Sequence, residues 1–483
     1  MLSAAPPPAI RIVATGKAAA APLQGRMLLF IARARGAHPP AKLEPGFVAS
    51  GVSVEGFEVH QAPKTAVTVP ADAFSFPAGV ATLPAGRYDI QPLLDTGHTY
   101  SYYGVYDGDL AGPVQRVRLM RGGRVTLVLD RKIQQPAPRA TSAVRLFSVK
   151  SALLSKFYGR PFRLRASVVL PVGYTPSRRY PVVYAQNGFG GDYTGGFELA
   201  GLRTMMHGDG LDALVVVTDS TTDTGIAQFA DSANNGPWGR AFTTEFIPAL
   251  ERAFPVDARP QRRFLWGHSS GGWASLWLQI AYPALFGGTW SSSPDPVDFH
   301  DFTGPDLVSR PPDNAYFTPF GRPWQLVRDG TKDVMTLRDF VLFSDAEGFR
   351  ESQFGSFDAV FSPRGADGNP LPLFDHRTGR VNPAVAAYWE ANYDIAARIE
   401  RAWPSLQSVV AHKVHIAVGT LDTFHLERGV LRLDARIRRL GVTPDITYFP
   451  GASHFSLFRP STGFEGFHWA FRGMAKAAKE SRK

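Results

Sequence analysis

Two patterns of apolar and polar positions follow one another along the chain. Over residues 1–133, short apolar or alternating runs, such as residues 26–31 and 125–129, are separated by Gly, Pro and Asp. No long run repeats with the helical period of 3.6 residues, and short runs between turn residues are typical of a β-sandwich. We therefore predict a small all-β domain at residues 1–133 and a linker, rich in Gln and Pro, at residues 134–142.

The remainder, residues 143–483, alternates between strand and helix patterns. Residues 180–185, 213–218 and 264–266 are short and almost wholly apolar, as are the strands of a parallel sheet covered on both faces. A helical pattern at residues 243–254 separates two of these strands. Strands and helices that alternate in this way predict an α/β domain with a doubly wound, mostly parallel sheet.

A long insertion, at about residues 295–410, interrupts the strand series of the α/β domain. Many prolines and glycines indicate that much of it is loop, with helices expected at about residues 336–345 and 383–401. An insertion at this point of such a sheet is expected over the active-site edge, so we interpret it as a lid and substrate wall.

The most informative stretch of the chain begins with the apolar residues 264–266. It continues as Gly267-His268-Ser269-Ser270-Gly271 and then as a helical pattern that reaches Pro283. This is the pattern G-x-S-x-G between a strand and a helix, which is typical of a nucleophile elbow. The helix N-terminus favours developing negative charge at this position. We therefore predict that Ser269 is a nucleophile.

A serine nucleophile needs a histidine base, and the base needs a carboxylate that orients it. Asp422 comes just after the apolar strand at residues 414–418, and His454 lies in the loop after the strand at residues 446–449. Both follow Ser269 in the order nucleophile, acid, base. We predict Asp422 as the acid and His454 as the base. The residues that compete for these two roles are Asp295, Asp298, Asp445, His268, His412, His415 and His425.

Two backbone N–H groups must face the substrate oxygen that becomes negative during acyl transfer. We expect one from Ser270, directly after the nucleophile, and the other from Phe189 in the glycine-rich loop at residues 186–191. A phosphate-binding loop is an alternative for this segment. However, a Lys-Ser/Thr pair does not follow it, which disfavours that alternative.

These motifs together resemble an esterase family of α/β-hydrolases. That family includes enterochelin esterases, feruloyl and acetylxylan esterases, S-formylglutathione hydrolases and mycolyltransferases. The resemblance is carried by the motifs at residues 180–191, 267–272, 419–422 and 451–454, and it extends over about residues 143–475. It implies an α/β-hydrolase fold and ester chemistry. The chain departs from the family pattern at Asn187, where the family often has histidine, and in its longer insertion.

Composition excludes several other classes of function. The chain has a formal net charge of +10, but its basic residues are scattered, and the densest cluster, residues 436–439, is expected to be a solvated helix face. We therefore predict no nucleic-acid partner. No apolar run is long enough to span a membrane. The chain lacks cysteine, which excludes disulfides and thiolate catalysis.

We predict neither a cofactor nor a metal site. Asp367, Asn369 and Asp375 lie close together in the insertion, but their spacing does not follow a calcium-binding loop, and plain turns are expected there. The absence of cysteine fits a secreted or periplasmic protein, and the first residues are consistent with the remnant of a removed signal peptide. A cytoplasmic location stays open.

The sequence thus predicts a serine esterase that acts on carboxylic esters through an acyl-enzyme. Feruloyl or acetyl polysaccharide esters and siderophore esters are the leading substrates, so the partner is a small-molecule or polysaccharide-linked ester. Acyl transfer by the same triad is an alternative, and so is a non-catalytic protein that binds glycans through the insertion or the aromatic residues 100–106. An interfacial lipase is disfavoured because the insertion carries charged residues, among them Arg328 and Lys332. The sequence does not indicate an oligomeric state.

Overall fold

The chain forms two compact units in a computed structural model that describes residues 6–20, 22–46, 51–100, 104–309, 313–348 and 352–481. The first unit comprises residues 1–137 and 338–355, and the second comprises residues 138–337 and 356–483. The boundary at Ala137 falls within the linker expected at residues 134–142.

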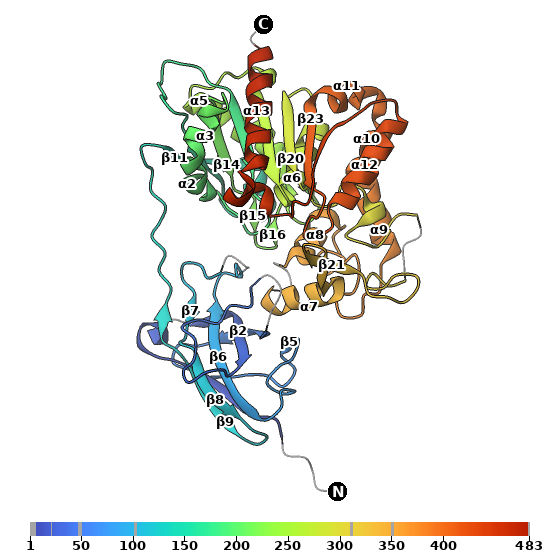
Figure 1. The fold of residues 1–483 in the computed structure, drawn as a ribbon. Helices are drawn as coiled ribbons and strands as arrows, with labels where there is room; N and C mark the ends of the chain where they lie inside the picture. The colour runs from blue at the N-terminus through green and yellow to red at the C-terminus, as the bar shows by residue number, and fades with distance from the viewer. Residues whose placement is uncertain are drawn as a thin grey trace. The chain divides into compact units, whose positions relative to one another are not determined.

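The strands of the first unit form two sheets around one apolar core (Figure 1). The three-stranded sheet has the order β4 (Val67–Thr68), β1 (Ala9–Ala14) and β9 (Arg124–Leu129). The larger sheet has the order β10 (Arg131–Lys132), β7 (Leu110–Ala111), β6 (Gly86–Asp95), β2 (Leu23–Arg33), β3 (Val52–Gln61) and β5 (Phe74–Phe76), and β8 (Gln115–Leu119) pairs with β6. Alternate residues such as Met27, Leu29 and Ile31 point into the core between the sheets.

A helix of the predicted insertion belongs to the first unit. This helix, α7 (Leu337–Gly348), joins the unit from residue 338 onward. Arg26 donates a hydrogen bond to the carbonyl oxygen of Asp345 at 2.8 Å, and the rings of Phe76 and Phe343 lie 6.3 Å apart. The assignment of all residues from 143 to 483 to the esterase domain was therefore wrong for this segment, because its apolar face packs on the all-β unit.

The first unit also contains a cavity of about 290 Å³, which is lined mainly by apolar side chains such as Phe30, Leu93 and Tyr100. The rings of Phe30 and Tyr100 lie 5.4 Å apart at its wall. Part of the aromatic segment considered for glycan binding, residues 101–103, lies outside the described residues.

The second unit is built on an eight-stranded sheet (Figure 1). Its order is β11 (Val144–Ser151), β12 (Phe162–Val169), β14 (Leu214–Thr218), β13 (Val182–Gln186), β19 (Arg263–His268), β20 (Gly288–Ser292), β23 (Val414–Gly419) and β24 (Asp445–Phe449). The two pairs that involve β12 are antiparallel, and every pair from β14 to β24 is parallel. The carboxyl ends of the parallel strands therefore meet at one edge, where ligands bind in open α/β sheets.

Helices cover both faces of this sheet. Val182 and Tyr184 of β13 pack in one apolar cluster with residues of α4 (Trp238–Ala241), α5 (Ile247–Ala253) and α6 (Ser270–Ala281). Val183 and Ala185 point to the opposite face, where the helices are α2 (Gly195–Leu199), α3 (Arg203–Gly208) and α13 (Glu465–Glu480). Strands β13 and β14 are almost wholly apolar because both of their faces are buried. The short helix α1 (Ala152–Tyr158) follows β11.

Beyond residue 355, and before residue 338, the insertion packs within the second unit. Its elements are a hairpin of β21 (Gln325–Asp329) and β22 (Lys332–Thr336), and the helices α8 (Gln353–Phe361), α9 (Pro383–Tyr393), α10 (Ile395–Arg401) and α11 (Trp403–Lys413). The helix expected at residues 383–401 is two helices. Asp394 has an extended backbone, with ψ of 113°, and its side chain accepts a hydrogen bond from Ala397 N, so it ends one helix and caps the next.

Candidate active site

Ser269 lies at the tip of a sharp turn between β19 and α6. Its backbone has φ of 59° and ψ of −126°, a conformation that non-glycine residues rarely adopt. A Cβ at Gly267 would lie 2.1 Å from the carbonyl oxygen of Gly271, and one at Gly271 would lie 2.1 Å from that of Gln186. Only glycine fits at these two positions, and the turn leaves Ser269 partly exposed while Ser270 is fully buried.

Asp422 and His454 lie together in two loops at the carboxyl edge of the sheet. His454 Nδ1 is 2.8 Å from Asp422 Oδ2, and the two side chains are 2% and 0% exposed. The loops that carry them also bond to each other, because Leu421 N donates to the carbonyl oxygen of Ala452 at 3.0 Å. With Nδ1 held by the carboxylate, Nε2 of His454 is left for proton exchange with a nucleophile.

The environment of Asp422 keeps this carboxyl group ionised. Burial raises its pKa, but the charge of His454, the hydrogen bond to that ring and a hydrogen bond from Phe424 N bring the pKa below the ordinary value. An ionised, buried carboxylate beside Nδ1 stabilises the imidazolium that forms when histidine accepts a proton.

His454 lies directly over the turn that carries Ser269. Its ring centroid is 4.3 Å from that of His268, the residue before Ser269, and aromatic rings of Phe424 and Phe455 lie 4.8 and 5.0 Å from it. Burial, followed by the influence of His454, lowers the pKa of His268 well below its ordinary value, so His268 is neutral. Among the described residues no hydrogen bond joins Ser269 to His454, and such bonds often tighten only when substrate binds.

The glycine-rich loop after β13 lies against the same turn. A Cβ at Gly188 would lie 3.6 Å from Cβ of Ser269, so the backbone of this loop borders the serine. Asn187, at the position where the family often has histidine, donates to the carbonyl oxygens of Asp192 at 2.8 Å and Thr218 at 2.7 Å. The amide therefore supports the loop from within. The N–H groups of Phe189 and Ser270 stay the predicted oxyanion donors.

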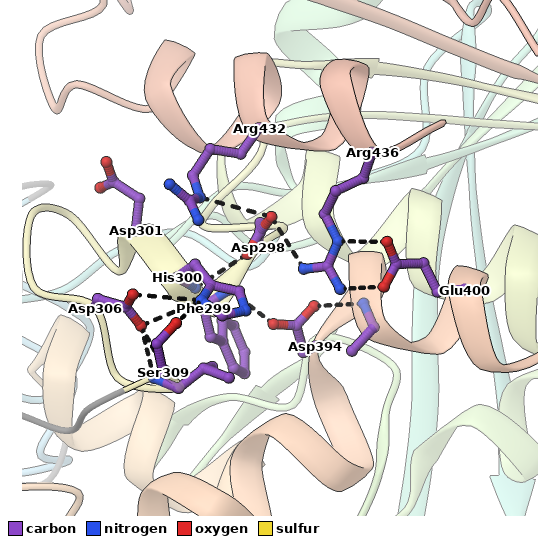
Figure 2. Close-up of polar contacts among 12 residues, drawn as sticks. Asp298, Phe299, His300, Asp301, Asp306, Ser309, Asp394, Glu400, Arg432 and Arg436 are labelled. Carbon is purple, nitrogen blue, oxygen red and sulfur yellow. Dashed lines mark hydrogen bonds and ion pairs between the residues drawn. The ribbon is translucent and has the colours of Figure 1, made fainter. Parts of the chain in front are cut away.

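The competing acids lie elsewhere or have other partners. Asp298 is fully buried, and its carboxylate faces Arg436 of α12 (Glu427–Arg439), with Arg436 Nη1 at 3.1 Å (Figure 2). Arg436 also pairs with Glu400 of α10 through two hydrogen bonds, of 2.9 and 2.5 Å. Asp298 therefore links the start of the insertion to α12 and, through Arg436, to α10. The solvated face expected for residues 436–439 was wrong for Arg436, whose side chain is only 13% exposed.

Three further candidates, Asp445, His415 and His425, also have other partners, and His412 is exposed on α11. Asp445 lies 2.6 Å from His415 Nδ1, and the ring of His415 stacks on Trp290 with centroids 4.5 Å apart. His425 is buried, with Nδ1 3.1 Å from Arg428, and burial and then Arg428 lower its pKa to about 4. Of the competing acids, only Asp295 lies at the serine turn, where it contacts Ser270 rather than His454.

Two polar side chains support this site in roles that were not predicted from the sequence. Asp295 accepts a hydrogen bond from Ser270 Oγ at 2.5 Å, and Arg328 donates from Nε to the carbonyl oxygen of Asp422 at 2.8 Å. Both residues belong to the insertion, and no local pattern links them to the motifs that they contact.

No group of three or more His, Cys, Asp or Glu side chains arranged to hold a metal occurs in the described part of the chain. Asp367 and Asp375 instead accept hydrogen bonds from residues two or three positions further on, as turn residues do. Within the same described ranges, no helix is both long and apolar enough to cross a bilayer.

Comparison with known proteins places the chain in a family. Residues 161–429, more than half of the chain, match the family model described as "Putative esterase". The chain belongs to this esterase family. It is accordingly a carboxylic ester hydrolase with an α/β-hydrolase domain.

Solved structures with similar folds include esterases and hydrolases. A ferulic acid esterase is 13% identical, with a TM-score of 0.43 over 69% of this chain and 98% of that one. An S-formylglutathione hydrolase from Staphylococcus aureus is 13% identical, with a TM-score of 0.42 over 69% and 100%. One from Agrobacterium tumefaciens is 14% identical, with a TM-score of 0.39 over 70% and 97%. No curated protein matches the chain.

Proposed function

We propose that this esterase cleaves carboxylic esters through an acyl-enzyme, with Ser269 as nucleophile, His454 as base and then acid, and Asp422 as the carboxylate that orients the histidine. The observation that carries the proposal is the buried contact of 2.8 Å between His454 Nδ1 and Asp422 Oδ2, at the edge of the sheet where Ser269 occupies a strained turn.

The chemistry follows from these positions. Ser269 Oγ attacks the ester carbonyl carbon while His454 Nε2 takes the hydroxyl proton. The negative oxygen of the tetrahedral intermediate accepts hydrogen bonds from the backbone N–H groups of Ser270 and Phe189. Collapse of the intermediate expels the alcohol, which receives the proton from His454. Water then attacks the acyl group on Ser269 while His454 takes one of its protons. When this second intermediate collapses, Ser269 Oγ receives that proton from His454 and the carboxylic acid leaves.

We propose feruloyl or acetyl esters of polysaccharides, or siderophore-type esters, as substrates. This proposal is supported by membership of the esterase family and by the resemblance of the motifs at residues 180–191 and 267–272 to the enzymes that cleave such esters. Transfer of the acyl group to an alcohol in place of water uses the same residues. The acceptor is then decided by how well the site excludes water.

The test is hydrolysis of p-nitrophenyl esters from acetyl to octanoyl, and of methyl ferulate, by the wild type and by Ser269→Ala. We expect the variant to lose at least roughly 10⁴-fold in kcat, since the nucleophile is removed. Activity that survives in Ser269→Ala would refute the assignment of the nucleophile. Adding glycerol or a sugar as acceptor and measuring the acylated product separates hydrolysis from acyl transfer. Glycan binding without any turnover by folded wild type would favour the non-catalytic protein.

A further inference from the structure

A second buried carboxylate lies beneath the serine turn. Asp295 follows β20 and is 6% exposed. Its Oδ2 accepts a hydrogen bond from Ser270 Oγ at 2.5 Å and another from Gln228 Nε2 at 3.2 Å. The carboxylate within hydrogen-bond distance of the proposed base, His454, is that of Asp422. Asp295 is therefore close to the reaction centre without being the acid of the triad.

Asp295 also holds the main chain of the turn. Its N–H donates to the carbonyl oxygen of Ser269 at 3.2 Å, and Trp273 N donates to the same oxygen at 3.0 Å. This carbonyl belongs to the peptide group whose N–H is that of Ser270. Because a trans peptide is planar, its N–H points away from its C=O, and a fixed carbonyl fixes the direction of the N–H. Asp295 thus contacts the carbonyl oxygen of this peptide group through its N–H, and the hydroxyl of Ser270, the residue that carries the proposed oxyanion donor, through its carboxylate.

The loop that carries Gln228 has a strained backbone. Gln228 is 1% exposed and has φ of +48°, and Phe229, which follows it, has φ of +51°. Two successive non-glycine residues in the left-handed region are rare, and the surrounding structure must offset the strain of each. This backbone directs the amide of Gln228 to Asp295.

We propose that Asp295 and Gln228 are positioning residues that hold the peptide group between Ser269 and Ser270, so that its N–H faces the developing oxyanion. The inference rests on the proposed function and deepens it. Asp295 Oδ2 fixes the hydroxyl of Ser270, its own N–H fixes the carbonyl oxygen of Ser269, and Gln228 fixes Asp295. The group acts through Ser270 and touches no reacting atom.

The experiment compares Asp295→Ala with Asp295→Asn on the p-nitrophenyl ester that the wild type hydrolyses best. An oxyanion donor acts mainly in the transition state. We therefore expect kcat of Asp295→Ala to fall by about 10- to 100-fold, with KM changed by less than about threefold. Ser270 and Gln228 both donate to Oδ2, so an Asn whose amide oxygen takes the place of Oδ2 keeps both hydrogen bonds. Asp295→Asn should therefore keep kcat within about fivefold of the wild type.

A second set of variants distinguishes positioning from a general loss of structure. If Asp295 acts through Ser270, then Asp295→Ala in a Ser270→Ala background should lower kcat by less than about threefold, because the shared hydrogen bond is already gone. The inhibition constant of an aryl boronic acid, which adds to Ser269 as a tetrahedral adduct, should rise in Asp295→Ala in proportion to the fall in kcat/KM. Tryptophan fluorescence reports whether each variant is folded.

Three outcomes would overturn the inference. The first is an unchanged kcat in folded Asp295→Ala. The second is that the falls in kcat of Asp295→Ala and Ser270→Ala multiply in the double variant. The third is that Asp295→Ala has a raised KM but an unchanged affinity for the boronic acid. If Asp295→Ala does not fold, the same comparison is made with Gln228→Ala, for which a smaller fall in kcat is expected and an unchanged kcat would again contradict the inference. A failure of the proposed function would be distinguishable from these outcomes, because it would show as ester hydrolysis by Ser269→Ala.

Discussion

Arg328 Nε donates a hydrogen bond to the carbonyl oxygen of Asp422 at 2.8 Å. The contact joins strand β21 of the insertion to the loop that carries the proposed acid of the triad. Arg328 N also donates to the carbonyl oxygen of Thr423 at 2.9 Å, and Arg328 Nη2 pairs with Glu427 at 2.8 Å, where both side chains are only 12% exposed. The insertion therefore supports the catalytic loop, in addition to any role as a substrate wall.

Replacing Arg328 should weaken both the fold and the activity. Arg328→Met removes one partner of a buried ion pair, which typically costs about 3–5 kcal/mol because the other charge stays buried. It also releases the loop of Asp422, so we expect a loss of about tenfold in kcat. Urea unfolding followed by tryptophan fluorescence measures the first effect, since all nine tryptophans lie in the second unit.

Two further variants sharpen this prediction. Arg328→Met combined with Glu427→Leu should recover much of the stability, because no unpaired charge remains, while kcat stays low. Arg322→Met, at an exposed position of the same insertion, is the matched control and should change neither quantity. Equal kcat values for Arg328→Met and the wild type would show that the loop of Asp422 does not depend on Arg328.

Asp422→Asn should lower kcat by about 10⁴-fold with little change in KM. The amide has the size of the carboxylate but not its charge. Phe424 N donates to Oδ1 of Asp422 at 3.0 Å, so the amide oxygen of Asn takes that place and its NH₂ group faces Nδ1 of His454. The histidine then adopts the wrong tautomer, and its protonated form is not stabilised. Asp445→Asn is a matched control, since Asp445 also lies within hydrogen-bond distance of a histidine, His415, at 2.6 Å. A similar loss in both variants would point to a general disturbance of structure.

The turn around Ser269 should tolerate no side chain at Gly271. A Cβ there would lie 2.1 Å from the carbonyl oxygen of Gln186, and backbone atoms cannot move aside cheaply. We expect Gly271→Ala to lower the urea midpoint of the second unit strongly and to abolish ester hydrolysis. Gly208→Ala in α3 is the control: nothing lies within 4 Å of its Cβ, and alanine is favoured in helices, so stability should stay the same or rise. A stable, active Gly271→Ala would contradict the strained turn.

The parts of the site that follow strand ends could be predicted from the sequence. Ser269, Asp422 and His454 each follow an apolar run, and parallel strands bring such positions to one edge of a sheet. Their motifs are local, so the chemistry could be inferred from residue type and order.

Contacts that depend on packing between distant segments could not be predicted. The charge of Arg328 is equally compatible with a solvated lid and with a buried pair, and only the fold brings it to Glu427. Similarly, the pattern of residues 336–345 predicts a helix but not its partner, and α7 packs on the all-β unit. Asp295 was considered as an acid because of its place after a strand, but its side chain direction, toward Ser270, is set by the turn after β20.

The buried carboxyl of Asp295 should make the second unit less stable as pH rises through its titration. Burial raises the pKa of Asp295 from 3.8 to about 6, and the charge of Asp422 also raises it. The hydrogen bond from Ser270, the charge of His454 and the hydrogen bond from Gln228 oppose this increase. The folded state therefore holds this proton more tightly than the unfolded state. This tighter binding of the proton contributes at most about 3 kcal/mol to the stability of the folded state. The contribution is fully present below about pH 4, falls as pH rises and is lost above about pH 6.

Asp295→Asn isolates this contribution, because an amide does not titrate in this range. We expect the free energy of unfolding of the wild type, relative to that of Asp295→Asn, to decrease between pH 4 and pH 7 and to be constant above it. Urea titrations of both proteins by tryptophan fluorescence give this difference, and other carboxyl groups cancel because they are common to both. A difference that is independent of pH would mean that Asp295 has the same pKa in the folded and unfolded states, and a difference that increases with pH would mean that its carboxylate is stabilised by the surrounding groups.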